Sequence, residues 1–203
     1  MSGEPLLTGR AHLAALSEAL FAMEAEVERL EGWGRHLASV LLGGGRLLAA
    51  GNGGSAALAE HLTGELVGRY RDDRRPFSAL ALHSDGAGLT AIANDYDAGG
   101  VFARLVEAHG RPGDVLLAIS TSGASPNVLA AAEAARRCGL TVWALTGRRP
   151  NPLAAGSHDA FCVEAGATAT VQEVHQVAVH LLCAAVDCET GASTPLRSER
   201  VSR

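Results

Sequence analysis

The sequence is poor in aromatic side chains, since Phe, Trp and Tyr make up 4% of its 203 residues. Apolar residues still make up 47%, so we expect a folded core built from aliphatic side chains and alanine. No apolar run approaches the ~20 residues that span a bilayer, and Met1–Arg10 lacks the basic and apolar stretches of a signal peptide. These absences predict a soluble, cytoplasmic, single-domain protein over residues 1–203.

The sequence also lacks a C-x-x-C pair, because Cys138, Cys162, Cys183 and Cys188 are spaced otherwise. Free thiols in a reducing compartment are the expected state. The net charge of −5 and the pI near 5.9 argue against a nucleic-acid or membrane partner. An anionic small molecule is not excluded, since backbone amides at a helix start can hold one phosphate.

The first segment, residues 1–42, carries a heptad seam and predicts a helical oligomerisation segment. The Gly32-Trp33-Gly34 stretch is expected to interrupt it before a second short helix. An ordinary amphipathic helix packed on its own domain is the alternative. The seam residues are Leu13, Leu16, Leu20, Met23, Val27 and Leu30.

Five short apolar runs then alternate with amphipathic stretches, a pattern typical of a parallel sheet covered on both faces. We therefore expect an α/β fold over residues 43–190: a three-layer sandwich with a five-stranded parallel sheet, followed by a disordered tail over 191–203. Ligands of such sheets bind beyond the carboxyl ends of the strands. The runs are 47–50, 78–82, 115–119, 140–145 and 160–163.

Two loops that follow predicted strands have the composition of anion sites. Residues 51–57 contain Gly53 and Gly54, which let the backbone approach a ligand, and Ser55, which can cap the next helix or bind an oxygen. Residues 119–127 offer four hydroxyl side chains around a glycine before a helix that starts near Pro126. These donors and the helix dipole suit a phosphate monoester. A tight turn and a helix cap without a ligand are the alternatives.

Two helices carry polar groups of catalytic or metal-binding type. Glu65 follows His61 by four residues, so both lie on one helix face. Gln172, Gln176 and His180 form a similar line on an otherwise apolar helix near the end of the chain. Such groups can bind a metal or act as acid and base. A surface pair and a hydrogen-bonded seam at a subunit contact are the alternatives.

Taken together, these motifs resemble the sugar isomerase (SIS) domain, and more specifically the sedoheptulose 7-phosphate isomerases. The resemblance covers nearly the whole chain and involves several ordered motifs. It implies a flavodoxin-like fold and a cytoplasmic homotetramer with active sites shared between subunits. The matching stretches are 51–57, 60–65, 89–96, 111–115, 119–128, 145–147 and 172–180.

The same resemblance implies one zinc ion per subunit and a set of substrate contacts. The implied metal ligands are His61, Glu65, Gln172 and His180. The implied substrate-binding residues are Asn52, Gly53, Gly54, Ser55, Glu65, Asn94, Asp95, Ser120, Thr121, Ser122, Ser125 and Gln172.

The expected reaction converts sedoheptulose 7-phosphate to D-glycero-D-manno-heptose 7-phosphate through a cis-enediol. Glu65 and His180 are the expected acid–base pair, and the sequence leaves open which takes the first proton. One relative with this fold has lost the chemistry and acts as an adaptor, with the positions that match Glu65 and His180 changed. Both residues are present here.

Two departures from the family pattern concern the margin of the site. Leu58 stands where relatives often have Asp, and Thr170-Val171 replaces the usual Arg-Ile. They bear on the identity of the sugar. The alternatives are therefore an isomerase or hydro-lyase of another sugar phosphate, and a non-catalytic SIS adaptor or sensor.

Overall fold

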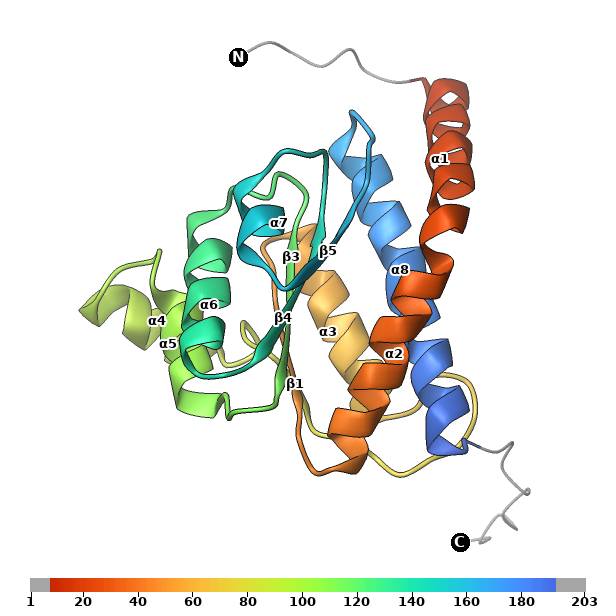
Figure 1. Cartoon of the computed structure of the whole chain (residues 1–203). Helices are drawn as coiled ribbons and strands as arrows, with labels where there is room; N and C mark the ends of the chain where they lie inside the picture. The colour runs from red at the N-terminus through yellow and green to blue at the C-terminus, as the bar shows by residue number, and fades with distance from the viewer. Residues whose placement is uncertain (1–7, 193–203) are drawn as a thin grey trace, which may run out of the picture.

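The structure is a computed structural model that describes residues 8–192. Five strands form one parallel sheet in the order β2-β1-β3-β4-β5, with helices on both faces (Figure 1). The predicted three-layer α/β fold is confirmed. The strands are β1 (Leu47–Ala50), β2 (Ala79–Ala81), β3 (Val115–Ser120), β4 (Thr141–Thr146) and β5 (Asp159–Cys162). The helices are α1 (Gly9–Met23), the 3-10 turn η1 (Glu24–Glu26), α2 (Val27–Leu42), α3 (Gly54–Val67), α4 (Gly86–Asp95), α5 (Val101–His109), α6 (Pro126–Arg137), α7 (Pro152–Gly156) and α8 (Thr168–Thr190).

The central strands are buried on both faces and supply alternate side chains to two cores. On β3, Leu117 and Ile119 join the core beneath α2, α3 and α8. Leu116 and Ala118 join the core beneath α5, α6 and α7. Figure 1 shows these two helical layers on opposite sides of the sheet. The arrangement gathers the loops after β1, β3 and β4 at one edge of the sheet.

The Gly32-Trp33-Gly34 stretch does not interrupt the helix, so that prediction was wrong. Helix α2 runs through it, and the break lies at η1 instead. Gly34 is needed because α2 crosses α8 closely there: a Cβ at Gly34 would collide with the Cβ of Ala185. Trp33 stacks on Trp143 with ring centroids 4.9 Å apart, and this contact fixes α2 against β4.

The heptad seam packs largely on its own domain. Met23 and Leu30 are buried, and Leu16 and Leu20 lie against the same core. Leu13 is 63% exposed. This packing fits the alternative of an amphipathic helix on its own domain, and the role of residues 1–42 in oligomerisation stays a prediction. A subunit contact made by this seam would use its exposed members, such as Leu13.

Some predictions concern residues outside the described part of the chain. The predicted tail over 191–203 lies outside it apart from residues 191 and 192, and the segment before residue 8 lies outside it as well. Among residues 8–192, the structure has no helix long and apolar enough to cross a membrane.

Candidate active site

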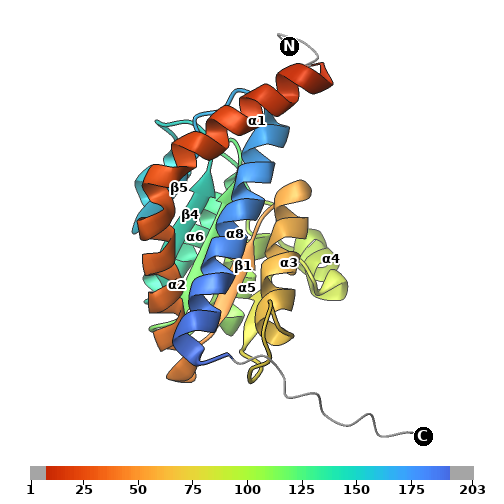
Figure 2. The ribbon, with the colours of Figure 1, turned by 90° about the vertical axis from the view of Figure 1, so that its right-hand side faces the viewer.

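Helices α3 and α8 lie side by side and carry most of the candidate residues (Figure 2). They run in the same direction, because the start of α8 faces the start of α3 and its middle faces the middle of α3. At the start, the side chain of Gln172 lies against Gly54, where an added Cβ would come within 2.6 Å of the Gln172 amide nitrogen. A glycine at position 54 is therefore what lets Gln172 enter the site.

The middle of the two helices brings the predicted acid–base residues together. The Nε2 atoms of His61 and His180 face each other at 2.9 Å. The Oε1 atom of Glu65 lies 3.7 Å from His61 Nε2, and the side-chain nitrogen of Gln176 lies 3.0 Å from His180 Nε2. All four side chains are partly exposed, so a ligand can reach them. The predicted pairs on separate helices thus form one cluster.

The cluster has the donor types that zinc prefers, two imidazole nitrogens and a carboxylate. Within residues 8–192, no group of three or more His, Cys, Asp and Glu is arranged to hold a metal ion. Gln172, the fourth implied ligand, lies against Gly54 at the start of the two helices, whereas the amide that contacts His180 belongs to Gln176. The facing ring nitrogens are the feature that fits a cation.

The end of β3 and the loop after it bring the hydroxyl groups of Ser120, Ser122 and Ser125 together, an arrangement we call the cradle. Binding of a phosphate by the cradle stays a prediction. The Ser120 Oγ atom lies 3.0 Å from Ser125 Oγ and 3.4 Å from Ser122 Oγ. The backbone N–H of Ala124 donates to Ser122 Oγ. Ser125 is the N-cap residue of α6 and makes no side-chain cap bond to it. The hydroxyls therefore converge at the start of α6, where the helix dipole favours an anion. The N–H groups of Val128 and Leu129 are already bonded within this first turn, so the hydroxyl groups would be the main donors.

The glycine loop after β1 is joined to this cradle through two asparagines. Asn52 and Asn127 exchange side-chain hydrogen bonds of 2.9 and 2.8 Å. Asn127 was not assigned a role from the sequence, although it lies within the Ser/Pro/Asn stretch that opens α6. Ser55 does not cap α3: the N-cap residue is Gly53, and Ser55 is buried in the first turn.

Asn94 and Asp95 are not brought to this cluster in the described structure. They end α4, a helix without any buried residue on the other side of the sheet from α3 and α8. Both are exposed, and the Asn94 side chain donates to Asp95. Their predicted contact with substrate stays a prediction.

A buried histidine connects α8 to the cradle. His175 is fully buried, and its Nε2 atom lies 3.1 Å from the carbonyl oxygen of Thr146. The Thr146 hydroxyl in turn donates to the carbonyl oxygen of Ser120 over 2.8 Å. Burial lowers the pKa of His175 from 6.5 to about 4, and the bond to Thr146 opposes this shift. His175 is therefore a neutral structural group between β4 and α8.

We expect His175 to make the free energy of unfolding rise with pH between about 4 and 6.5. In this window the unfolded chain binds a proton at this imidazole and the folded chain does not, so acid favours unfolding. The rise should total about 3 kcal/mol, at about 1.4 kcal/mol per pKa unit. Urea unfolding across the window should show a smaller rise for His175→Asn and an unchanged one for the exposed His36→Asn. Equal pH dependence in all three proteins would contradict the assignment.

Sequence comparison places these features among known proteins. Residues 11–147 match the SIS domain. The chain is 64% identical over 187 residues to a phosphoheptose isomerase of Streptomyces coelicolor, covering 92% of this chain and 80% of that protein.

Two solved structures are similar over almost their whole length. The phosphoheptose isomerase GmhA of Neisseria gonorrhoeae aligns with a TM-score of 0.81 and 38% identity, over 88% of this chain and 96% of that one. A phosphoheptose isomerase of Francisella tularensis aligns with a TM-score of 0.83 and 33% identity, over the same shares of the two chains.

Proposed function

Because the chain belongs to the phosphoheptose isomerase family of SIS-domain proteins, we propose that this isomerase converts sedoheptulose 7-phosphate to D-glycero-D-manno-heptose 7-phosphate. The observation that supports this most directly is the meeting of Glu65 and His180 at the ring of His61. An aldose–ketose isomerase needs an acid and a base at one place, and a separate anchor for the phosphate.

The proposed reaction moves one proton between C1 and C2 of the sugar. A base removes a proton from C1 while an acid protonates the carbonyl oxygen at C2, which gives a cis-enediol. Return of a proton to C2 and loss of the proton on the C1 oxygen then give the aldose. Glu65 and His180 fit these two roles because they approach the same point from α3 and α8.

The cradle on β3 and α6 fits the role of phosphate anchor. Its hydroxyl groups at Ser120, Ser122 and Ser125 lie on elements other than the two that carry the acid–base pair. Contacts with Thr121 and with the Asn52 loop would complete it. Binding the remote phosphate would position C1 and C2 and so contribute to catalysis without touching the reacting atoms.

A zinc ion is the cofactor that we propose, held by His61, Glu65, Gln172 and His180. When bound, it would supply Lewis-acid stabilisation of the oxygen atoms at C1 and C2. The facing Nε2 atoms of the two histidines support this proposal. Glu65 and His180 would still have to exchange protons with the sugar.

We also propose that the protein acts in the cytoplasm as a homotetramer. Leu13 and Phe21 are 63% and 75% exposed, and their spacing of eight residues places them on one stripe of α1. Apolar side chains on such a stripe suit a contact with another subunit. Cys138, Cys162, Cys183 and Cys188 are all free, which suits a reducing compartment. Light scattering by the purified protein measures the oligomeric state directly.

The substrate is tested by an activity panel of ketose phosphates with seven, six and five carbons, together with unphosphorylated sedoheptulose. We expect turnover to be fastest with the seven-carbon phosphate and to be lost without the phosphate, since the cradle would then have nothing to anchor. Faster turnover of a shorter sugar phosphate would overturn the assignment of the sugar and leave the reaction class standing.

A further inference from the structure

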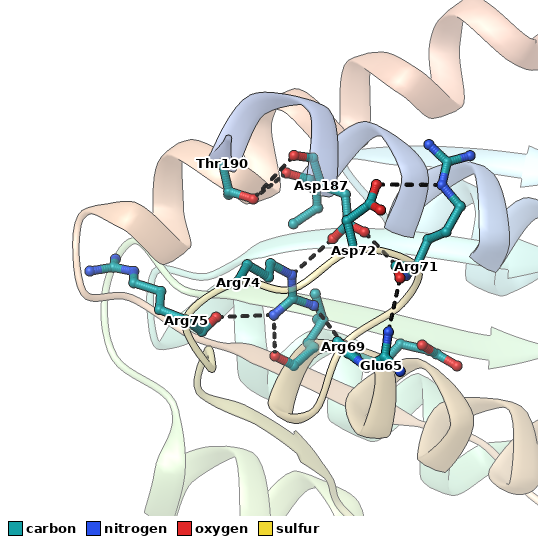
Figure 3. Close-up of polar contacts among 10 residues, drawn as sticks. Glu65, Arg69, Arg71, Asp72, Arg74, Arg75, Asp187 and Thr190 are labelled. Carbon is teal, nitrogen blue, oxygen red and sulfur yellow. Dashed lines mark hydrogen bonds and ion pairs between the residues drawn. The ribbon is translucent and has the colours of Figure 1, made fainter. Parts of the chain in front are cut away.

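The segment between α3 and β2, residues 68–78, lies against the C-terminal ends of α3 and α8 (Figure 3). Its Arg74 side chain is 3% exposed and forms an ion pair with the Asp187 side chain, which is 6% exposed. The Nε atom of Arg74 lies 2.9 Å from Asp187 Oδ1. A charge pair this deeply buried needs all its hydrogen bonds to be made, so the partners of the remaining nitrogen atoms are informative.

The other two nitrogen atoms of Arg74 reach the last turn of α3. Nη2 donates to the carbonyl oxygen of Glu65 over 2.5 Å, and Nη1 donates to that of Leu66 over 2.9 Å. Carbonyl groups in the last turn of a helix lack partners within the helix. One rigid guanidinium therefore caps α3 and holds α8 at the same time.

Two contacts of this guanidinium lie on the helical elements that carry the acid–base pair. One partner is the backbone of Glu65 itself. The other, Asp187, follows His180 by seven residues, which is two turns along the same face of α8. We call these contacts the bridge: the ion pair of Arg74 with Asp187 and the two hydrogen bonds from Arg74 to the carbonyl oxygens of Glu65 and Leu66.

A ring contact and a buried thiol show that the region between the bridge and the site is packed. The ring of Tyr70, from the same segment as Arg74, lies 5.6 Å from that of His180 between centroids. Burial raises the pKa of the Cys183 thiol to about 12, and the charges of Glu65 and Asp187 raise it further while Arg74 opposes them. Cys183 is 1% exposed and belongs to the core beneath α2, α3 and α8, so the part of α8 between His180 and Asp187 is packed against its neighbours.

We propose that Arg74 and Asp187 are positioning residues for the acid–base pair: the bridge holds the turn of α3 that carries Glu65 against the part of α8 that carries His180, and it seats Tyr70 on the His180 ring. This inference rests on the proposed function. Loss of the bridge would let the two helices separate at the site. A displacement of about 1 Å between reacting groups can slow a reaction by about 100-fold.

The test compares Arg74→Gln with Arg75→Gln. Arg75 is a matched control, since it comes from the same segment and donates to the carbonyl oxygens of Leu41 and Leu42 at the end of α2, away from the pair. We expect Arg74→Gln to lower kcat by about 10- to 100-fold with KM unchanged, because the cradle on β3 is untouched. Arg75→Gln should keep kcat.

A second pair of variants separates positioning from stability. Asp187→Glu keeps the carboxylate, so it should retain most of the wild-type kcat. Asp187→Asn removes the negative charge and should lower kcat as Arg74→Gln does. If Arg74→Gln fails to fold, Arg74→Lys takes its place. Lysine keeps the positive charge and lacks the planar guanidinium that donates to Asp187, Glu65 and Leu66 together. Hydrogen exchange by mass spectrometry adds a readout that needs no turnover. Backbone amides of 61–67 and 180–187 should exchange faster in the bridge variants and not in Arg75→Gln.

The results separate this inference from the proposed function. If the wild-type protein does not isomerise the sugar phosphate, the proposed function is wrong. Hydrogen exchange would then still show whether the bridge joins the two helices. With an active wild type, bridge variants that melt at lower temperature but keep kcat would overturn the positioning role. A fall of kcat equal in Arg74→Gln and Arg75→Gln would overturn it as well.

Discussion

Glu65→Gln and His180→Gln should each lower kcat for sedoheptulose 7-phosphate by about 100- to 10,000-fold, the range that general acid–base catalysis contributes. Each change removes one of the two groups that exchange protons with C1 and C2. Glutamine keeps the approximate size of both side chains. The surrounding contacts of α3 with α8 at Gly54 and at the bridge do not involve either side chain, so the fold should persist. Steady-state kinetics measures kcat, and far-UV circular dichroism reports whether the fold persists.

The matched control is Glu60→Gln. Glu60 lies on the same helix, is exposed, and contacts His83 and Ser84 rather than the cluster. It should keep normal kcat and KM. Near-normal turnover by both Glu65→Gln and His180→Gln would contradict the assignment, whereas loss of turnover in the Glu60 variant would show that the assay responds to any change of charge on α3.

Removal of bound metal should lower turnover by at least about 100-fold, because a Lewis acid at a developing charge contributes several kcal/mol. Dialysis against a strong chelator should remove zinc, and adding zinc back should restore the rate. His61→Gln should lose both the metal and the rate, since His61 supplies a ring nitrogen to the cluster and is not part of the acid–base pair. Elemental analysis of each sample reports the metal content per chain.

The control for this experiment is the non-ligand histidine His175, which is buried and bonded to Thr146. In His175→Asn we expect the zinc content of the wild type. Full activity in protein that elemental analysis shows to be free of metal would contradict the zinc proposal. It would leave the roles of Glu65 and His180 standing, because those rest on proton transfer.

The sheet could be predicted from sequence because each of its strands is a short apolar run that is buried on one or both faces. The limits of these runs differ from the observed strand ends by at most one residue, as at β4 and β5, where hydrogen-bond pairing rather than hydrophobicity sets the ends. The error at Gly32-Trp33-Gly34 has a tertiary cause. Glycine weakens a helix locally, but the close approach of α8 at Ala185 compensates for it.

The candidate site could be predicted only where its residues share a helix. His61 and Glu65 are one turn apart, and so their common face follows from spacing alone. Helix α3 follows β1 and helix α8 follows β5. The contact of this face with His180 therefore depends on the positions of β1 and β5 in the sheet. Arg74 and Tyr70 could not be found in the same way, because they lie in a segment without periodicity whose path is set by contacts with both helices.

The most direct test of the proposed isomerisation follows deuterium during the reaction. Wild-type protein is incubated with sedoheptulose 7-phosphate in heavy water, and the sugars are analysed by NMR. The account predicts that the aldose 7-phosphate forms with deuterium at C2, that recovered ketose gains deuterium at C1, and that Glu65→Gln does neither. Recovery of unchanged, unlabelled ketose from the zinc-loaded wild-type protein would contradict it.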